Sequence, residues 1–473
     1  MSNKSFDFKK NIRKALQDKQ LRGNLRFAMD SMTQKRKAVF HDPDRLEALR
    51  RKGSAIRSRS LENLPRLLEQ LESACSKNGI RVHWAETVSE ANTIVLDILR
   101  QHKVRRVVKG KSMVSEEMHL NAFLKKNGID PLETDLGEFI IQLAGETPSH
   151  IIVPAIHKNK SEIAALFEKH IPDTPYTENV EELNAIARKT LRQRFSEAEA
   201  GISGVNMAVA ETGTLCLVEN EGNGRMCTTL PPVHIALMGI EKVVEKFTDV
   251  PPLMELLTGS ATGQRMTTYF NLISSPRRAG EKDGPQEVHL ILLDNGRTSI
   301  LGDPELRQTL KCIRCGTCLN HCPVYTRIGG HAFGYVYPGP IGTILTPQME
   351  GLDRTNGIPE ASSLCNACEE VCPVMIPIPG IIRRIRNEGK DEKGRVKGHG
   401  SGKHLMESAA WKGWALVNTH PRLNSLGMKT MKILGSELPK AGPVKTWSAF
   451  RSTPRLSKTT LQELVKKEGV EDE

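Results

Sequence analysis

Apolar residues recur at helical spacing through the first sixty residues, separated by basic and polar positions. The stripe consists of Phe8, Ile12, Leu16, Leu21, Leu25, Met29 and Met32. Spacings of mostly four residues place such side chains on one face of a helix. The pattern therefore predicts basic helices over residues 1–60.

From about residue 61 the pattern alternates between short apolar runs and helical stripes. Helices are expected over residues 61–76, 89–102, 160–170 and 179–195, and Ser89 is expected to cap the second of them. Strands are expected over residues 80–85, 104–108, 139–143, 151–154, 234–239 and 288–294, with two more in 205–219, broken at 211–214. Strands that alternate with helices at this length indicate βαβ units and a mostly parallel sheet.

The fold class is therefore predicted as α/β, with four segments in a chain too long for one typical core. Residues 1–60 form a helical arm, and residues 61–300 form the α/β domain that contains the whole sheet. Residues 301–390 form a loop-rich, mostly helical module. Residues 391–473 begin with a Gly/Lys linker at 391–403 and continue as a helical tail that carries Trp411, Trp414 and Trp447.

Positive charge is concentrated in the arm. The chain has a formal net charge of 67 − 55 = +12, and residues 1–60 contribute 17 − 6 = +11 of it. Such an arm could attract nucleic acid, acidic lipid or an acidic protein partner. Because few aromatic residues accompany the basic ones, we favour a helical arm that packs on its own chain or on a sister subunit over nucleic-acid binding.

The chain lacks the signals of export and membrane insertion. Charged residues punctuate positions 4–19, so no signal-peptide core is present, and no window reaches ~18 uninterrupted apolar residues. Cysteines at ligand spacing indicate thiolate–metal chemistry, which requires a reducing compartment. We expect a cytoplasmic protein without a transmembrane segment, and the basic arm leaves peripheral contact with the membrane open.

Seven of the ten cysteines fall into two runs. The first is Cys312, Cys315, Cys318 and Cys322, closed by Pro323, and the second is Cys365, Cys368 and Cys372, closed by Pro373. The first run has the C-x2-C-x2-C-x3-C-P spacing of bacterial ferredoxins that bind [4Fe–4S] clusters. A zinc site, which typically uses two C-x2-4-C pairs, explains a run of four cysteines poorly. The runs therefore predict a two-cluster, ferredoxin-like module for electron transfer, with a purely structural cluster as the alternative.

The ferredoxin rule assigns the ligands of the two clusters, because the fourth cysteine of each run binds the cluster of the other run. The first cluster is then held by Cys312, Cys315, Cys318 and Cys372, and the second by Cys322, Cys365 and Cys368. The residue at the expected position of the eighth ligand is Ser362. The second cluster could therefore have three irons, or four irons and a labile corner. Alternatively, the missing ligand could come from Ser362, Ser363, His331, Cys216 or Cys227.

Three further segments carry a family resemblance. Residues 210–214 (AETGT) and 284–289 (GPQEVH) resemble the LUD domain of lactate-utilization proteins, and residues 337–342 (YPGPIG) are typical of the connector between the cysteine runs. Together with the cysteine runs, the chain resembles the iron–sulfur proteins of bacterial L-lactate utilization, the LutB/YkgF type. The resemblance covers essentially the whole chain.

The resemblance implies a fold and a role. The LUD fold is similar to the sugar-isomerase and CoA-transferase α/β folds, which by itself establishes no activity. The implied role is electron transfer in the oxidation of L-lactate to pyruvate, which allows growth on lactate. The implied partners are a cysteine-rich protein of the CCG type and a smaller LUD protein. The seven run cysteines carry over as ligands of two [4Fe–4S] clusters, and the gap at Ser362 belongs to the family pattern.

Other candidate sites lie in the α/β region. The turn at 211–214 could cradle an anion, with Glu211, Thr212, His234 and Asn206 around a small-carboxylate pocket. The loop at 109–112 could bind an anion at a helix N-terminus. The alternatives are a tight turn and a solvated loop. Residues 398–404 only faintly match a phosphate loop and are interpreted as linker.

No catalytic residue can be assigned from the sequence. We expect a non-catalytic or partly catalytic subunit of an oxidoreductase. The alternative is an enzyme whose LUD domain binds and transforms a small carboxylate or a CoA-type substrate, with the clusters as an electron relay.

Overall fold

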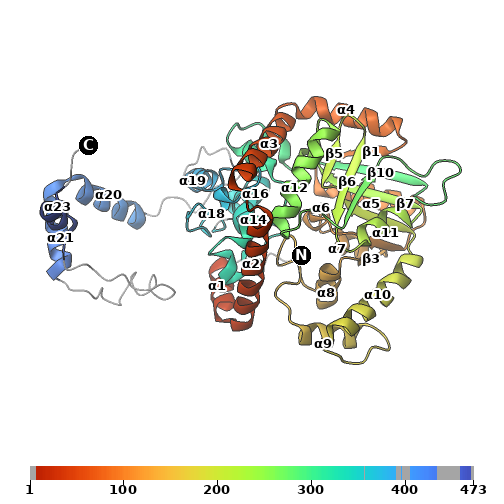
Figure 1. Ribbon diagram of the computed structural model, residues 1–473, viewed down its shortest axis with the longest axis horizontal. Helices are drawn as coiled ribbons and strands as arrows, with labels where there is room; N and C mark the ends of the chain where they lie inside the picture. The colour runs from red at the N-terminus through yellow and green to blue at the C-terminus, as the bar shows by residue number, and fades with distance from the viewer. Residues whose placement is uncertain (1–6, 356, 390–395, 397–404, 434–458, 470–473) are drawn as a thin grey trace. The chain divides into compact units, whose positions relative to one another are not determined.

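The computed structural model describes residues 7–355, 357–389, 396, 405–433 and 459–469 (Figure 1). The chain divides into two compact units, Met1–Gly400 and Ser401–Glu473, and the first contains all ten cysteines. None of the described helices is both long enough and apolar enough to cross a membrane.

The basic arm consists of three helices, α1 (Phe8–Gln17), α2 (Lys19–Val39) and α3 (Pro43–Glu62). The side chains of Asp18 and Asp42 cap α2 and α3 by accepting backbone N–H groups. Leu25 and Met29 of the apolar stripe are fully buried, and the rest of the stripe packs partly buried against the core that surrounds the cysteine runs. The helical prediction for the arm is confirmed, and the arm packs on its own chain.

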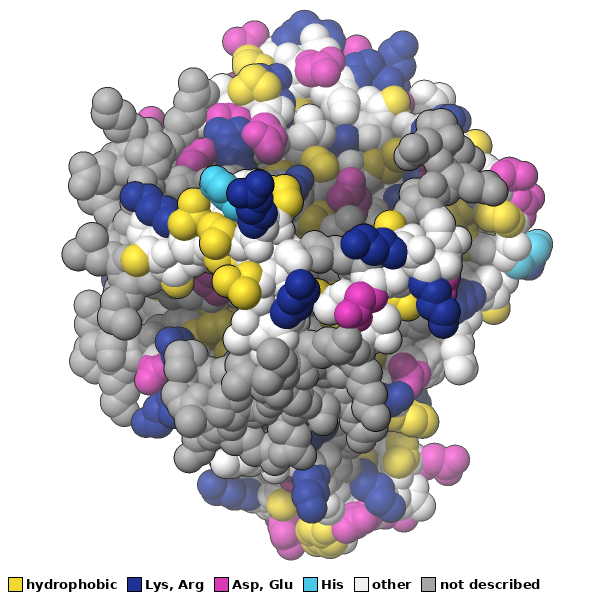
Figure 2. Space-filling model, turned by 90° about the vertical axis from the view of Figure 1, so that its left-hand side faces the viewer, with side chains coloured by type: hydrophobic (Ala, Val, Ile, Leu, Met, Phe, Trp, Pro, Cys, Tyr) yellow, Lys and Arg dark blue, Asp and Glu magenta, His cyan; other side chains and the backbone are white. Residues whose placement is uncertain are grey.

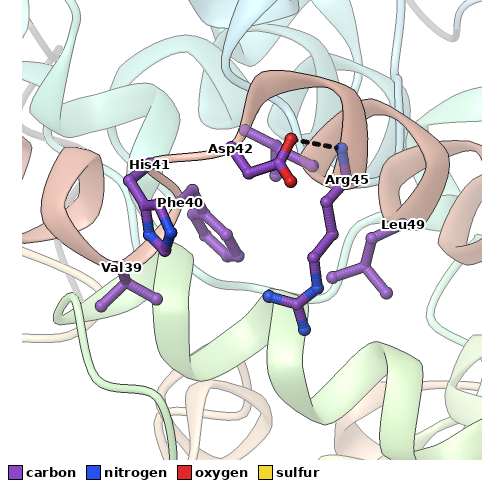
Figure 3. Close-up of a pocket in the computed structure, with 7 residues that line it drawn as sticks. Val39, Phe40, His41, Asp42, Arg45 and Leu49 are labelled. Atoms are coloured by element: carbon purple, nitrogen blue, oxygen red, sulfur yellow. Dashed lines mark hydrogen bonds between the residues drawn. The ribbon is translucent and has the colours of Figure 1, made fainter.

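A small hollow marks the corner between α2 and α3 (Figure 3). Its volume is about 70 Å³, which is room for roughly two water molecules. One wall is the ring of Phe40, which packs against Gly259 of helix α12 (Val250–Ala261). The hollow is therefore a by-product of helix packing.

A six-stranded parallel sheet forms the centre of the α/β region, with the strand order β1-β10-β7-β4-β2-β3. The strands are β1 (Arg81–Ala85), β2 (Arg106–Lys109), β3 (Asp130–Glu133), β4 (Ala200–Gly204), β7 (Val233–Gly239) and β10 (Glu287–Leu293). The helices of the region are α4 (Leu64–Lys77), α5 (Val88–Gln101), α6 (Met113–Glu117), α7 (Leu120–Lys126), α8 (Leu136–Ala144), α9 (Lys160–His170), α10 (Val180–Ser196), α11 (Asn223–Thr229), α12 and α13 (Arg297–Leu301). The predicted α/β class with a mostly parallel sheet is confirmed.

Alternating residues of the central strands enter two different cores, which is why these strands are apolar throughout. Ile235 and Ile291 face α5 and α7, whereas Ala236 and Leu290 face the leucines of α4. The leucine stripe of α4 is Leu64, Leu67, Leu68 and Leu71, as its spacing predicts.

The prediction that the two strands in 205–219 belong to the main sheet is wrong. They are β5 (Met207–Val209) and β6 (Thr214–Glu219), and they form a second sheet with β8 (Val243–Val244) and β9 (Tyr269–Ile273), in the order β8-β5-β6-β9. The turn between them is short enough for the two strands to pair antiparallel with each other. A parallel place in the main sheet would have required a long crossover.

The strands predicted at 139–143 and 151–154 are also absent. Residues 139–143 lie in helix α8, whose N-terminus is capped by Asp135 and whose C-cap is Gly145 in a left-handed conformation. Residues 151–154 are irregular. A short apolar run has no periodicity that separates a strand from a helix, so the caps were the better signal. Strands β3, β4, β8 and β9 were not predicted.

The two cysteine runs lie in a module of short helices joined by tight turns. The helices are α14 (Thr317–Asn320), α15 (Tyr325–Ile328), α16 (Gly339–Glu350), α17 (Leu352–Thr355), α18 (Ala367–Glu370) and α19 (Ile378–Glu388). The module shares one apolar core with the arm and with α12.

The second unit contains α20 (Leu405–Thr419), α21 (Pro421–Ile433) and α23 (Leu461–Glu468). Trp411 and Trp414 of α20 are exposed and their rings lie 5.8 Å apart. The predicted linker at 391–403 lies almost wholly outside the described residues, and the glycine-rich segment 398–404 and Trp447 lie wholly outside them.

Candidate functional site

Three thiols of the first run and one of the second line a single small cavity. They are Cys312, Cys315, Cys318 and Cys372. Cys315, Cys318 and Cys372 are at most 8% exposed. Burial raises the pKa of Cys318, and the charges of Cys315, Cys312, Cys368 and Cys372 raise it further. Such thiols stay protonated unless a cation binds them, because ligand thiols must lose their protons to a metal.

The other three thiols form a second group. Burial raises the pKa of Cys368 to about 12, and nearby Cys322 and Cys365 raise it further. Cys322 and Cys368 are buried, whereas Cys365 is exposed. The second thiol group therefore opens to the surface at one corner.

The two runs share a local backbone conformation. In each run the turn cysteine is flanked on both sides by left-handed residues: Arg314 (φ 60°) and Gly316 (φ 73°) around Cys315, and Leu364 (φ 54°) and Asn366 (φ 64°) around Cys365. A four-residue helix follows each turn, α14 in the first run and α18 in the second. Left-handed non-glycine residues are uncommon and mark sites under functional constraint. The runs are a structural repeat.

The repeat places Ser362 where the first run has Cys312. The backbone N–H of Arg314 donates to Cys312 Sγ at 3.4 Å, and the backbone N–H of Leu364 donates to Ser362 Oγ at 3.1 Å. Both donors are two residues downstream of their acceptors.

Of the alternative eighth ligands, His331 is hydrogen-bonded elsewhere, and Cys216 and Cys227 are held within a strand and a helix of the α/β region. His331 Nε2 lies 2.7 Å from the carbonyl oxygen of Thr147, and its ring contacts that of His157. Cys216 lies in β6 and Cys227 in α11, and burial raises the pKa of each to about 12.

The thiol spacing fits a cluster better than a single metal ion. Four thiolates around one zinc ion at ~2.3 Å would lie roughly 3.8 Å apart. Within the described part of the chain, the groups of three or more His, Cys, Asp or Glu ligand atoms within 4.8 Å of one another are His102, Glu287 and His289, and Glu146, His157 and His331. Neither group includes a cysteine. Each of their carboxylates already pairs with a cation, Arg81 or Lys158.

Basic side chains surround the loops that carry the first thiol group. Arg50 Nε donates to the carbonyl oxygen of Cys372 at 3.0 Å, and Arg36 Nη2 donates to that of Val371 at 3.3 Å. Lys242 Nζ donates to the carbonyl oxygen of Cys312 at 3.0 Å. On the face seen in Figure 2, Lys and Arg side chains stand singly or in small groups among acidic and apolar ones. Part of the arm's positive charge is therefore directed inward, at the cysteine loops.

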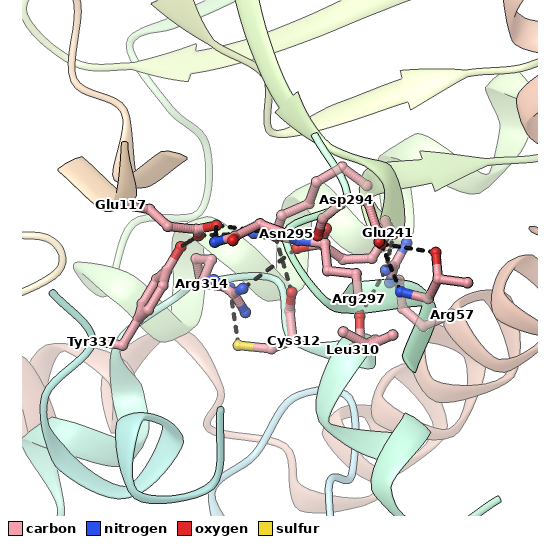
Figure 4. Close-up of polar contacts among 12 residues, drawn as sticks. Arg57, Glu117, Glu241, Asp294, Asn295, Arg297, Leu310, Cys312, Arg314 and Tyr337 are labelled. Atoms are coloured by element: carbon pink, nitrogen blue, oxygen red, sulfur yellow. Dashed lines mark hydrogen bonds and ion pairs between the residues drawn. The ribbon is translucent and has the colours of Figure 1, made fainter. Parts of the chain in front are cut away.

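A buried ionic network joins the α/β region to the cysteine module (Figure 4). Arg297 binds both oxygens of Glu117 at 2.9 Å and Glu241 Oε2 at 2.7 Å, and all three side chains are at most 7% exposed. From the module, the Tyr337 hydroxyl donates to Glu117 at 2.9 Å and Arg314 Nη2 donates to Glu241 at 3.3 Å. Burial opposes ionisation of Glu241, but Arg297, Lys242 and Arg314 together lower its pKa to about 2.

A cavity of about 420 Å³ lies at the carboxyl ends of strands β2 and β4. Its lining includes the loop residues 110–112 and Asn206, and on the module side Ile313, Arg314 and Tyr337. The loop predicted to bind an anion therefore lines a real cavity. The other proposed pocket does not form: Glu211 accepts the backbone N–H of Phe247, Thr212 bonds Thr214, and His234 bonds Ser203 inside the sheet.

The comparisons with known proteins agree with this architecture. Family models for the LUD domain match residues 68–293, for the 4Fe-4S dicluster domain residues 308–376, and for the C-terminal part of lactate utilisation protein B residues 384–470. Lactate utilization protein B of Bacillus velezensis is 39% identical over 97% of this chain and 96% of its own length. The chain belongs to the lactate utilization protein B family. The resemblance to the LutB/YkgF type is thus confirmed.

Two further relatives are equally similar. Lactate utilization protein B of Bacillus subtilis is 39% identical over 96% of this chain and 95% of its own, and the uncharacterized electron transport protein YkgF of Escherichia coli is 39% identical over 98% of each chain. A crystal structure of a DUF162 family protein from Deinococcus radiodurans aligns with 49% of this chain and 98% of its own at 15% identity and a TM-score of 0.29, which is too distant to carry an argument. The dicluster match makes this member of the lactate utilization protein B family an iron–sulfur protein.

Sequence reasoning missed the network residues Glu117, Glu241 and Arg297, because no local motif marks them. The residues of the cysteine module that contact this network, Arg314 and Tyr337, did lie in segments that the sequence had singled out. Arg314 stands inside the first cysteine run, and Tyr337 begins the segment 337–342 that carried the resemblance.

Proposed function

We propose that this chain is the electron-transfer iron–sulfur subunit of a system that oxidises L-lactate to pyruvate. Full-length relatives carry the names lactate utilization protein B and electron transport protein YkgF, which support this role. The observation that carries the proposal is the arrangement of the seven run cysteines in two adjacent groups, with all but Cys365 in or against one core.

The donor sets fit two iron–sulfur clusters, held by Cys312, Cys315, Cys318 and Cys372, and by Cys322, Cys365 and Cys368. We infer that both are [4Fe–4S] clusters, which supply one-electron transfer when bound. The chain supports them with backbone N–H groups aimed at sulfur. The backbone N–H of Tyr325 donates to Cys322 Sγ at 3.4 Å, and that of Ile376 donates to Cys372 Sγ at 3.3 Å.

The Ser362 hydroxyl is the proposed occupant of the eighth ligand position. Its place in the repeat, with the same N–H donor two residues downstream, supports the assignment. A serine oxygen binds iron more weakly than a thiolate, so this corner would be labile.

The proposed partners are a CCG-type cysteine-rich protein and a smaller LUD protein. The exposed Cys365 marks the face at which a redox partner would dock, because the first thiol group is shielded by protein. We propose a cytoplasmic location, with peripheral contact at the membrane left open.

Anaerobic purification with iron and sulfide counts and EPR tests the ligand assignment. About eight irons per chain would indicate two four-iron clusters, and about seven would indicate one three-iron cluster. Ser362→Cys should raise the iron count or its resistance to chelation, whereas the matched control Ser363→Cys should not. A protein that binds zinc and no iron would refute the proposal.

A second candidate function is that the LUD domain itself transforms a small carboxylate or a CoA-type substrate. The cavity beside the first thiol group favours it. We expect that the isolated, cluster-loaded chain does not reduce a dye on addition of L-lactate, and that turnover requires the partners. Turnover by the chain alone would contradict a pure carrier role.

A further inference from the structure

We propose that the 420 Å³ cavity of the α/β region is a binding site for a small organic carboxylate, with Arg314 as its anchor. This inference rests on the proposed function, because it places a ligand beside the first thiol group.

The location is one where α/β folds bind ligands. The loops 110–112 and 204–206 that line the cavity follow the carboxyl ends of the adjacent strands β2 and β4. Open parallel sheets present their ligand sites outside these ends. A volume of about 420 Å³ falls within the roughly 300–1,000 Å³ range of small-molecule sites.

Arg314 brings unused hydrogen-bond donors to this cavity. Its side chain is only 9% exposed, and its Nε and Nη1 groups have no hydrogen-bond partner, while Nη2 donates to Glu241. A buried guanidinium rarely leaves donors unpaired, and each unpaired group costs free energy. An anionic oxygen in the cavity would satisfy them.

The guanidinium is held in place. Its carbon lies 4.8 Å from the centre of the Tyr337 ring, and the backbone of Arg314 has the left-handed conformation described above. A strained residue in a fixed position is typical of a pre-organised site. Arginine, with its planar fork of donors, suits a carboxylate better than a lysine would.

The charge along the cavity wall is uneven. The basic groups in its lining are Lys111, Lys242 and Arg314, and the acidic groups are Asp135, Glu219, Glu221 and Glu241, of which Glu241 already pairs with Arg297 and Arg314. The acidic groups would repel a second anionic centre. The lining therefore fits a ligand with one carboxylate and an uncharged polar remainder.

The cavity and the first thiol group share a wall. Ile151, Ile313 and Arg314 line both the large cavity and the small cavity of the four thiols. A carboxylate on Arg314 would lie one residue layer away from the proposed redox centre. That proximity is the reason to expect a redox-active carboxylate such as a 2-hydroxy or 2-oxo acid.

Calorimetric titration of the anaerobically purified, full-length chain tests the inference, with L-lactate, pyruvate and inorganic phosphate as probes. We expect L-lactate or pyruvate to bind and phosphate to bind at least tenfold more weakly. Arg314→Gln should weaken binding by about ten- to a hundredfold, as expected for a lost charged hydrogen bond. Arg50→Gln is the matched control, because it removes an arginine that contacts Cys372 but does not line the cavity.

A steric variant tests the site without touching the thiols. Ala261 lines the cavity from α12, so Ala261→Phe should fill it and reduce carboxylate binding at least tenfold with the iron content unchanged. If neither L-lactate nor pyruvate binds, or if phosphate binds as tightly as they do, the inference is wrong. Undiminished carboxylate binding by the Arg314→Gln variant would likewise overturn the inference. A change in the EPR spectrum of that variant would not rescue the inference, because Arg314 would then act only on the cluster. Iron counts on the same samples separate this result from failure of the proposed function, since a chain without iron would refute that function directly.

Discussion

Glu117 is the residue on which the link between the α/β region and the cysteine module depends most directly. Its two oxygens accept from Arg297 at 2.9 Å each, from Asn295 at 2.7 Å and from Tyr337 at 2.9 Å. Glu117→Gln keeps the size of the side chain but removes its charge and replaces one acceptor oxygen with a donor. The new amide donor would face the N–H groups of Arg297. The substitution therefore removes the ion pair between Glu117 and Arg297 and puts no equivalent hydrogen bonds in its place.

The expected cost follows from burial. Arg297 is 1% exposed and Glu117 is 7% exposed, so water cannot take over the lost interactions. Removing one partner of a buried, hydrogen-bonded ion pair costs about 3–5 kcal/mol. With an unfolding entropy of ~2.1 cal/mol/K per residue, the unit of 400 residues has an unfolding entropy of ~0.84 kcal/mol/K. Dividing the lost free energy by this entropy gives a fall of roughly 4–6 °C in the thermal midpoint.

Differential scanning calorimetry of the cluster-loaded, full-length chain under anaerobic conditions measures this shift. The control is Asp30→Asn, which breaks the ion pair of Arg26 with Asp30 on α2. Both side chains of that pair are largely exposed, so its loss should move the midpoint by less than about 1 °C. If Glu117→Gln shifts the midpoint no more than the control, the network does not hold the two regions together and the reasoning fails.

Three further substitutions test other parts of the structure by thermal midpoint. Burial and the charge of His289 lower the pKa of His234 to about 3, so the free energy of unfolding should be highest above pH 6.5 and about 2 kcal/mol lower at pH 5. His234→Gln should reduce this dependence of the thermal midpoint on pH, and an unchanged dependence would contradict the reasoning. Burial raises the pKa of Glu138 well above 4.5, and both its carboxylate oxygens lack hydrogen-bond partners, so the wild-type protein should lose stability as the pH rises above 4.5. Glu138→Gln should therefore raise the thermal midpoint more at pH 8 than at pH 5. Equal effects at the two pH values would argue that this carboxyl group is ionised in the folded protein. A Cβ on Gly342 would lie 1.7 Å from the carbonyl oxygen of Tyr337, so Gly342→Ala should sharply lower the thermal midpoint and the iron content. The control is Gly23→Ala in α2, which has open space around it and should raise the thermal midpoint slightly.

Local patterns predicted the parts of the fold that local interactions determine. The α4 stripe and the helices α9 and α10 follow their periodicity and caps. The cysteine spacing predicted which thiols would lie together: Cys372 joins the first run in one cavity although it is 54 positions beyond Cys318. The proximity of these four thiols followed from the ferredoxin spacing rule, whereas their binding of a cluster stays a prediction.

Features that depend on tertiary neighbours could not be predicted in the same way. Strand β4 contains Gly201 and Gly204, which is a poor strand signal. Gly201 is required because a Cβ there would lie 1.8 Å from the carbonyl oxygen of Cys227 in α11. Likewise, the charges of Glu241 and Arg297 meet only after β7 and β10 pair, 56 positions apart in sequence.

The basic arm shows how charge and fold depend on each other. Arg57 is 2% exposed and donates to four backbone carbonyl oxygens, those of Glu241, Val243, Leu310 and Lys311. Two of these carbonyls follow β7 in the α/β region and two directly precede Cys312, so one side chain of α3 ties the α/β region to the first cysteine run. Salt screens the charge of exposed basic residues, whereas the charge of a buried residue such as Arg57 is screened much less. The burial of Arg57 indicates that the arm is part of the framework that orders the cysteine loops, and that its positive charge offsets the thiolates from inside the core.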